Sequence, residues 1–139
     1  MIKQKIVAGT AQLGFKYFHK EKITKKRSIK ILKSIVKNKI NILDTANSYG
    51  KSESYIGDFS KINKNRFIIC SKLKKSFSKN PLRLRKNIKE SILSSLDKLK
   101  VKKIDYFFIH NYTDLNKSVS KELLKFKLKK YLKNIGASI

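Results

Sequence analysis

Cysteine is almost absent from this sequence, and long apolar runs are missing. Cys70 is the only cysteine, so no disulfide can form within the chain, and a reducing compartment is the natural expectation. We interpret Cys70 as a small buried hydrophobe of a strand and not as a nucleophile. No run approaches the roughly 18 apolar residues of a membrane-spanning helix, and the N-terminal apolar stretch is too short for a signal peptide. We therefore expect a cytoplasmic protein with no membrane partner.

Acidic residues are scarce as well, since 9 Asp and Glu stand against 35 Lys and Arg and the formal net charge is +26. A strongly basic chain can mark a nucleic-acid partner. Only four of the basic residues are arginines, and the lysines are spread through every segment, whereas specific phosphate and base recognition favours arginine. We expect non-specific polyanion binding at low salt and no specific nucleic-acid partner. A basic nucleic-acid-binding domain is kept as an alternative function.

Glycine-rich motifs and linker-like segments are also missing. There is no Gly-x-Gly-x-x-Gly sequence, so a Rossmann fold has no support. No Gly/Ser linker divides the chain, and 139 residues suit one domain or part of a larger one. We treat residues 1–139 as a single domain and expect no metal site.

Apolar runs alternate with amphipathic stretches along the chain, which is typical of β/α units around a parallel sheet. We expect strands at about residues 6–8, 41–44, 67–72 and 104–110, and the start of a fifth at 135. We expect helices at about residues 25–38 and 52–59, after Pro81, and at 120–132. The pattern therefore predicts an α/β fold with about four β/α units and the beginning of another strand.

Chemically capable side chains follow the strands. Asp44 ends the second expected strand, with Tyr49 five residues later, while Lys72 ends the third strand and His110 the fourth. Taken singly, each of these residues also has an explanation without a functional role. Asp44 could cap the next helix, Tyr49 could be a half-buried ring, and Lys72 or His110 could simply reach solvent. Because the carboxyl ends of parallel strands meet on one face, where barrel enzymes place their chemistry, their common position predicts a shared site.

The sequence resembles the N-terminal part of an aldo-keto reductase. The matching segments are Gly9-Thr10-Ala11-Gln12-Leu13-Gly14, the signature-like stretch from Asp44 to Glu53, Ser71-Lys72, Ile109-His110-Asn111, and Ile135-Gly136-Ala137-Ser138. The resemblance runs through the whole chain but covers only about the first half of an eight-unit barrel of roughly 250 or more residues. It implies a partial TIM (β/α)8 barrel, and so a truncated barrel domain.

The resemblance also implies a chemistry, which is hydride transfer between NADPH and a small-molecule carbonyl substrate. Tyr49 would donate the proton. A free phenol, with a pKa of about 10, donates poorly near neutral pH unless a cation helps, and Lys72 would be that cation. Asp44 would pair with Lys72 and hold it in place, and His110 would orient the substrate carbonyl. The amino-acid sequences of these motifs resemble those of bacterial family members that are linked to the metabolism of surface sugars. A keto sugar or an aldehyde is therefore the expected substrate.

For the cofactor, the resemblance implies contacts from Gly9, Thr10, Asp44 and Ser138 at the nicotinamide end of NADP(H). Ile139 stands where many members carry Asn, and Phe18 stands where the first loop of many members has Gly. The family holds the pyrophosphate and the 2′-phosphate mainly with loops after the seventh and eighth strands, which this chain lacks. We therefore expect an N-terminal fragment with weak NADPH binding and little activity alone.

An open half-barrel also suggests a non-catalytic alternative. The first and fifth strands would be unpaired edges, with apolar inner faces left uncovered. Such a half-barrel would associate with itself, or with a complementary half, to rebuild a closed sheet.

Overall fold

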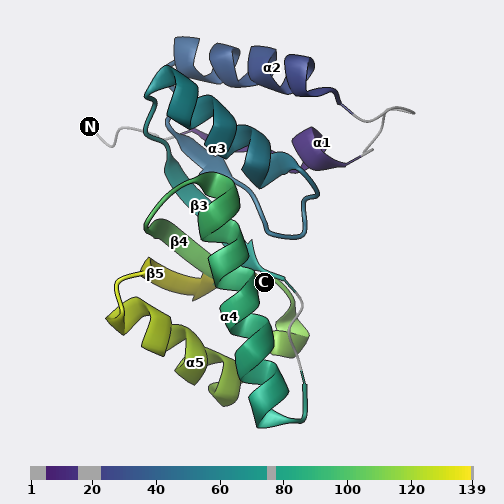
Figure 1. Cartoon of the computed structure of the whole chain (residues 1–139), viewed down its shortest axis with the longest axis vertical. Helices are drawn as coiled ribbons and strands as arrows, with labels where there is room; N and C mark the ends of the chain where they lie inside the picture. Colours follow the sequence, from purple (N-terminus) through teal and green to yellow (C-terminus); the bar gives the residue numbers. More distant parts are fainter. Residues whose placement is uncertain (1–5, 16–22, 75–77, 139) are drawn as a thin grey trace.

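The computed structural model describes residues 6–15, 23–74 and 78–138. Five parallel strands form one sheet in the order of the sequence (Figure 1). The strands are β1 (Val7–Gly9), β2 (Ile42–Asp44), β3 (Ile68–Leu73), β4 (Ile104–Ile109) and β5 (Leu132–Ala137). The helices are α1 (Ala11–Gly14), α2 (Lys25–Lys37), α3 (Ser52–Asn63), α4 (Pro81–Leu99) and α5 (Lys117–Leu128), with a 3-10 turn η1 (Tyr112–Asp114). Within these described ranges, no helix is both long enough and apolar enough to cross a membrane.

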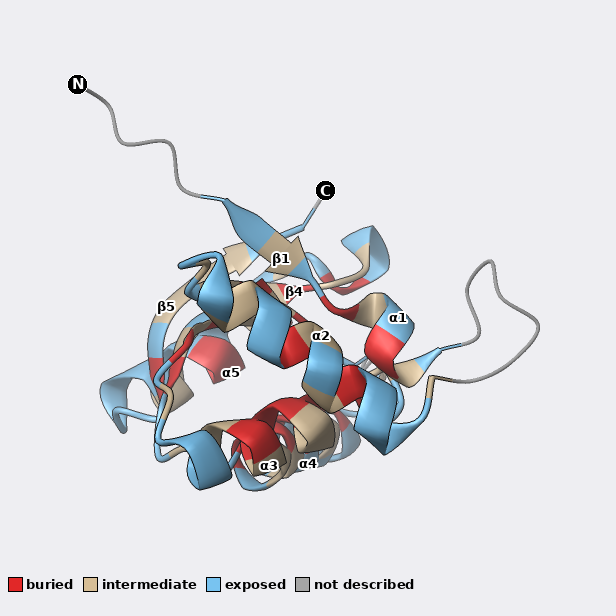
Figure 2. Cartoon of the chain, turned by 90° about the horizontal axis from the view of Figure 1, so that it is seen from above, coloured by how far each residue is buried: buried red, intermediate tan, exposed pale blue. Residues whose placement is uncertain are grey.

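The two faces of the sheet have different surroundings. Leu43, Ile69 and Phe107 are buried and belong to the hydrophobic core under the helices, which lie along one side of the sheet (Figures 1 and 2). Because side chains alternate along a strand, their neighbours point the other way. We call this other side the open face; it carries Val7, Ile42, Ile68, Tyr106 and Phe108, none of which is fully buried.

Side chains at the N-termini of three helices, α2, α4 and α5, explain where these helices begin. The Thr24 hydroxyl accepts a hydrogen bond from the Arg27 N–H at the start of α2. The Asn80 side chain accepts from two backbone N–H groups at the start of α4, with Pro81 in the first turn, and Asn116 caps α5. These contacts satisfy backbone donors that have no partner within the helix.

The expected order of strands and helices is confirmed, and the differences lie at the element ends. Residues 11–14 form the short helix α1, which is not among the expected helices. The last helix runs over 117–128 instead of 120–132, and β5 begins at Leu132 instead of 135. The chain turns between them at Lys130, whose φ is 63°. This left-handed turn ends the helix, but its lysine gives no sequence signal of a helix end.

Candidate active site

The loop after β2 brings Tyr49 back over the sheet, and two glycines fix its path. Gly50 has a φ of 53°, a conformation that glycine adopts without strain. A Cβ at Gly14 would lie 1.6 Å from the carbonyl oxygen of Tyr49, so α1 and the loop can pack this closely only because Gly14 has no side chain. The backbone of Tyr49 is therefore held against the end of α1.

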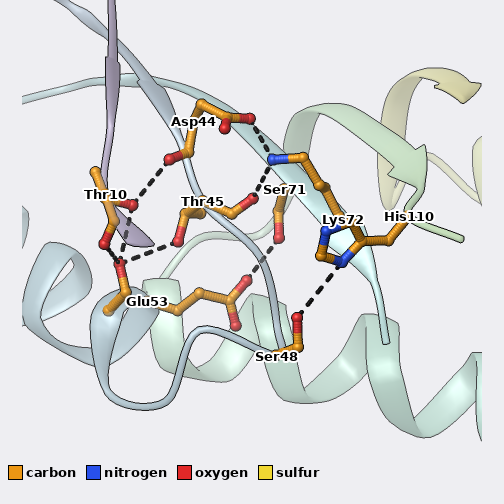
Figure 3. Close-up of polar contacts among 9 residues, drawn as sticks. Thr10, Asp44, Thr45, Ser48, Glu53, Ser71, Lys72 and His110 are labelled. Atoms are coloured by element: carbon orange, nitrogen blue, oxygen red, sulfur yellow. Dashed lines mark hydrogen bonds and ion pairs between the residues drawn. The ribbon is translucent and has the colours of Figure 1, made fainter. Parts of the chain in front are cut away.

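Lys72 and Asp44 form an ion pair at the C-terminal ends of their strands. Lys72 Nζ donates to Asp44 Oδ1 at 2.5 Å and to the Thr45 carbonyl oxygen at 3.1 Å (Figure 3). The Lys72 side chain is 7% exposed and that of Asp44 is 36% exposed. The ammonium group is thus nearly removed from water, while the carboxylate that compensates it remains partly hydrated.

The Tyr49 ring is close to both the cation and the imidazole. Lys72 Nζ is 5.3 Å from the ring centroid, within the range of a cation–π contact. The His110 ring meets Tyr49 edge-on, with centroids 5.8 Å apart, and Phe15 meets it at the same separation. Four side chains from three separate segments of the sequence therefore gather in one place: Asp44, Tyr49, Lys72 and His110.

His110 is held in a partly buried position at the end of β4. Its Nδ1 lies 3.5 Å from the Ser48 hydroxyl (Figure 3), which comes from the same loop as Tyr49. Burial lowers the pKa of His110 below its usual value, and the positive charge of Lys72 lowers it further, while Asp44 acts in the opposite direction. The imidazole is therefore neutral at pH 7, where one ring nitrogen donates and the other accepts.

The lowered pKa of His110 predicts a pH dependence. As the pH falls through about 6.5, the unfolded chain takes up this proton before the folded chain does, so His110 lowers the free energy of unfolding in acid. NMR titration of its ring nitrogens should give a midpoint below that of His110 in the urea-unfolded chain. The variant Lys72→Met should raise the midpoint, because a nearby positive charge is lost. A native midpoint at or above the unfolded one would contradict this description of the site.

The residues expected at the nicotinamide have different surroundings. Gly9 faces open space, because a Cβ built there would meet no atom within 4 Å. Thr10 is buried, and its hydroxyl donates to the Asp44 carbonyl oxygen and accepts from Ser52. Ser138 is exposed just after β5, and its N–H donates to the Ile109 carbonyl oxygen. Phe18 and Ile139, where the sequence departs from the family pattern, lie outside the described residues.

A buried polar layer beneath this site was not expected from the sequence. The Ser71 hydroxyl donates to Glu53 Oε1 at 2.7 Å, and the Ser52 hydroxyl lies 3.2 Å from that of Thr45 (Figure 3). Burial raises the pKa of Glu53, against the effect of its hydrogen bond from Ser71. One signal was available, because Ser71 immediately precedes Lys72 in a strand and must point to the opposite face. This layer ties α3 to the strands that carry Asp44 and Lys72.

Solved structures with the same fold extend well beyond this chain. A putative aldo-keto reductase from Pseudomonas aeruginosa is 22% identical with a TM-score of 0.75, and the match covers 95% of this chain and 54% of that one. The holo form of an aldo-keto reductase from Bacillus halodurans is 21% identical with a TM-score of 0.77, covering 96% and 45%. A glycerol dehydrogenase from Gluconobacter oxydans is 23% identical with a TM-score of 0.72, covering 94% and 43%.

These likenesses concern the fold, and the chain spans about half the length of each structure. The expected partial TIM barrel is thereby confirmed. No curated protein matches the sequence significantly. The model of the aldo/keto reductase family matches residues 5–138, which is nearly the whole sequence. The chain therefore belongs to the aldo/keto reductase family.

Proposed function

We propose that this chain carries the proton-donating half of an NADP-dependent oxidoreductase site that reduces a carbonyl compound, either an aldehyde or a keto sugar. The observation that carries the proposal is the position of Lys72 Nζ, which is 2.5 Å from Asp44 Oδ1 and 5.3 Å from the centroid of the Tyr49 ring. The buried ammonium favours negative charge beside it. A phenol that donates its proton to a developing alkoxide becomes negative at this place, so the site suits Tyr49 as the acid.

The other groups support the same assignment. Asp44 holds Lys72 in place and compensates its charge. Neutral His110 can donate a hydrogen bond to a carbonyl oxygen placed next to Tyr49. When bound, NADPH would supply the hydride for the carbonyl carbon. The open space at Gly9 fits the nicotinamide end of this cofactor. Thr10 and Asp44 lie at the ends of the neighbouring strands β1 and β2, and Ser138 follows β5 at the other edge of the sheet.

We also propose that the chain is an N-terminal fragment with little activity of its own. The loops that hold the cofactor phosphates in the family have no counterpart in its four β/α units and fifth strand, as the described residues show them. The nicotinamide emission of NADPH should therefore fail to saturate below about 1 mM when the chain is titrated at moderate salt. Saturable binding in the micromolar range, combined with aldehyde-dependent NADPH oxidation that Tyr49→Phe abolishes, would show instead that this half-barrel works alone.

Association is a second candidate role, supported by the open face and by the free edges of β1 and β5. Val7 is 50% exposed and Tyr106 is 40% exposed on that face. Such apolar surface and unpaired strand edges favour pairing with another chain. Size-exclusion chromatography beside the NADPH titration distinguishes the states: a concentration-dependent oligomer supports association, and a monomer at all concentrations contradicts it.

A further inference from the structure

A hollow lies away from the candidate active site, between α4 and α5. These two helices lie side by side in Figure 1. The volume of the hollow is about 650 Å³, within the range of small-molecule sites. None of the four active-site residues lines it. The residues that line it belong to α4, to α5 and to the segments just before these helices. We call it the α4–α5 cleft.

Five basic side chains line the α4–α5 cleft, against a single carboxylate from Glu122. They are Lys79, Arg85, Lys117, Lys121 and Lys125. The hollow of about 670 Å³ beside the end of α4 is different, because its four basic residues face two aspartates. One of these, Asp58, is itself bound to Lys25 and Lys100. The excess of positive charge is therefore larger in the α4–α5 cleft.

Glu122 fixes two of these cations. Its side chain is 10% exposed, and Oε1 accepts from Lys125 Nζ at 2.7 Å and from Arg85 Nε at 3.3 Å. Burial works to raise the pKa of Glu122, but the hydrogen bond from Lys125 and the charge of Arg85 outweigh it and hold that pKa below its ordinary value. The carboxylate is thus ionised at neutral pH and orients a cation from each helix.

The oriented cations keep donors for a ligand. Arg85 uses only Nε toward Glu122, and its side chain is 60% exposed, so the two terminal nitrogens of the guanidinium can form a forked contact with an anion. Ser78, Thr113 and Ser118, each of which carries a hydroxyl group, are also among the residues that line the cleft. Arginine, lysine and hydroxyl donors around one hollow form a set that suits phosphate oxygens.

We propose that the α4–α5 cleft binds a phosphorylated small molecule. The five basic residues outnumber the one carboxylate of the cleft by more positive charge than a ligand with a single carboxylate could neutralise. A phosphate ester or a diphosphate supplies more negative charge in a small volume. A hollow of about 650 Å³ between two helices also matches the size of a metabolite better than that of an extended polyanion. This site is independent of the proposed reductase site, so Tyr49→Phe should leave it unchanged.

The first test uses inorganic pyrophosphate as the probe, titrated calorimetrically into the full chain at about 0.3 M salt, where diffuse surface attraction is largely screened. We expect saturable binding of pyrophosphate. Arg85→Gln should weaken this binding about tenfold, because one charge-assisted contact is lost. Lys33→Gln removes the same charge from an exposed position on α2 and should change little. Absence of saturable binding, or equal weakening by both variants, would overturn the proposal.

The second test uses the sign of the effect of Glu122→Gln. If binding depends only on net charge, removing a carboxylate strengthens it. If Glu122 orients Arg85 and Lys125, the same change weakens pyrophosphate binding severalfold although the chain becomes more positive. Tighter pyrophosphate binding by this variant would contradict the proposal. So would a DNA duplex that binds more tightly than pyrophosphate and loses affinity with Arg85→Gln, because the cleft would then serve a nucleic acid.

Discussion

Tyr49→Phe is expected to reduce the turnover of carbonyl reduction by about 10²–10⁴-fold, the usual contribution of a positioned general acid. The ring would keep its packing against Phe15 and His110, but no proton could pass from it to the developing alkoxide. The enzyme to assay is one in which this chain is completed by the cofactor-binding half. Affinity for NADPH should change little, since the hydroxyl group acts in the chemical step.

The control for this variant is Tyr112→Phe. Tyr112 lies in the turn after β4 and is 80% exposed, so losing its hydroxyl group should leave turnover unchanged. Steady-state rates with a series of aldehydes measure both variants. An activity that survives Tyr49→Phe, or that falls equally in both, would remove Tyr49 from the role of proton donor.

Asp44→Ala is expected to lower the free energy of unfolding by about 3 kcal/mol, because it leaves a buried ammonium group without its counter-charge. Lys72→Met should cost less. The carboxylate that it leaves behind is 36% exposed and can bind water, whereas the Lys72 side chain is only 7% exposed. The ion pair is therefore asymmetric, and the larger loss belongs to the aspartate.

Urea unfolding of the two single variants and of the double variant Asp44→Ala/Lys72→Met measures this asymmetry. The double variant should recover much of the loss of Asp44→Ala, because no buried charge remains unpaired. Two outcomes would show that Lys72 is better hydrated than its burial indicates. One is an equal loss of the free energy of unfolding in the two single variants, and the other is a loss in the double variant equal to the sum of the two single losses.

The sequence predicts the order of the elements and the meeting of Asp44, Tyr49, Lys72 and His110, because both follow from simple rules. Alternating apolar runs and amphipathic stretches specify β/α units, and residues at the carboxyl ends of parallel strands must share an edge. The contact between Ser48 and His110 could not be read in this way, since it depends on the path of the loop from β2 to α3. For the partner of Glu53 the sequence offers a partial signal, because Ser71 precedes Lys72 in β3 and points to the opposite face of the sheet.

Helix ends are the least predictable part of this fold, and composition explains why. Among the described residues, four lysines adopt the left-handed conformation, at φ values from 53° to 63°, where glycine is the usual residue. They are Lys39, Lys64, Lys100 and Lys130. With only 5 glycines in the chain, these turns carry no distinctive residue. The helix expected to end at residue 59 therefore continues to Asn63, and the last helix ends before its expected limit.

Transfer of deuterium from NADPH labelled at the reactive C4 position to an aldehyde tests the central claim most directly. The protein is this chain, alone and together with the product of any coding sequence that continues beyond residue 139. The proposed function predicts one deuterium on the carbinol carbon of the alcohol, formed in a reaction that stops with Tyr49→Phe and continues with Tyr112→Phe. An alcohol without deuterium, or no alcohol from a completed barrel that binds NADPH, would contradict it.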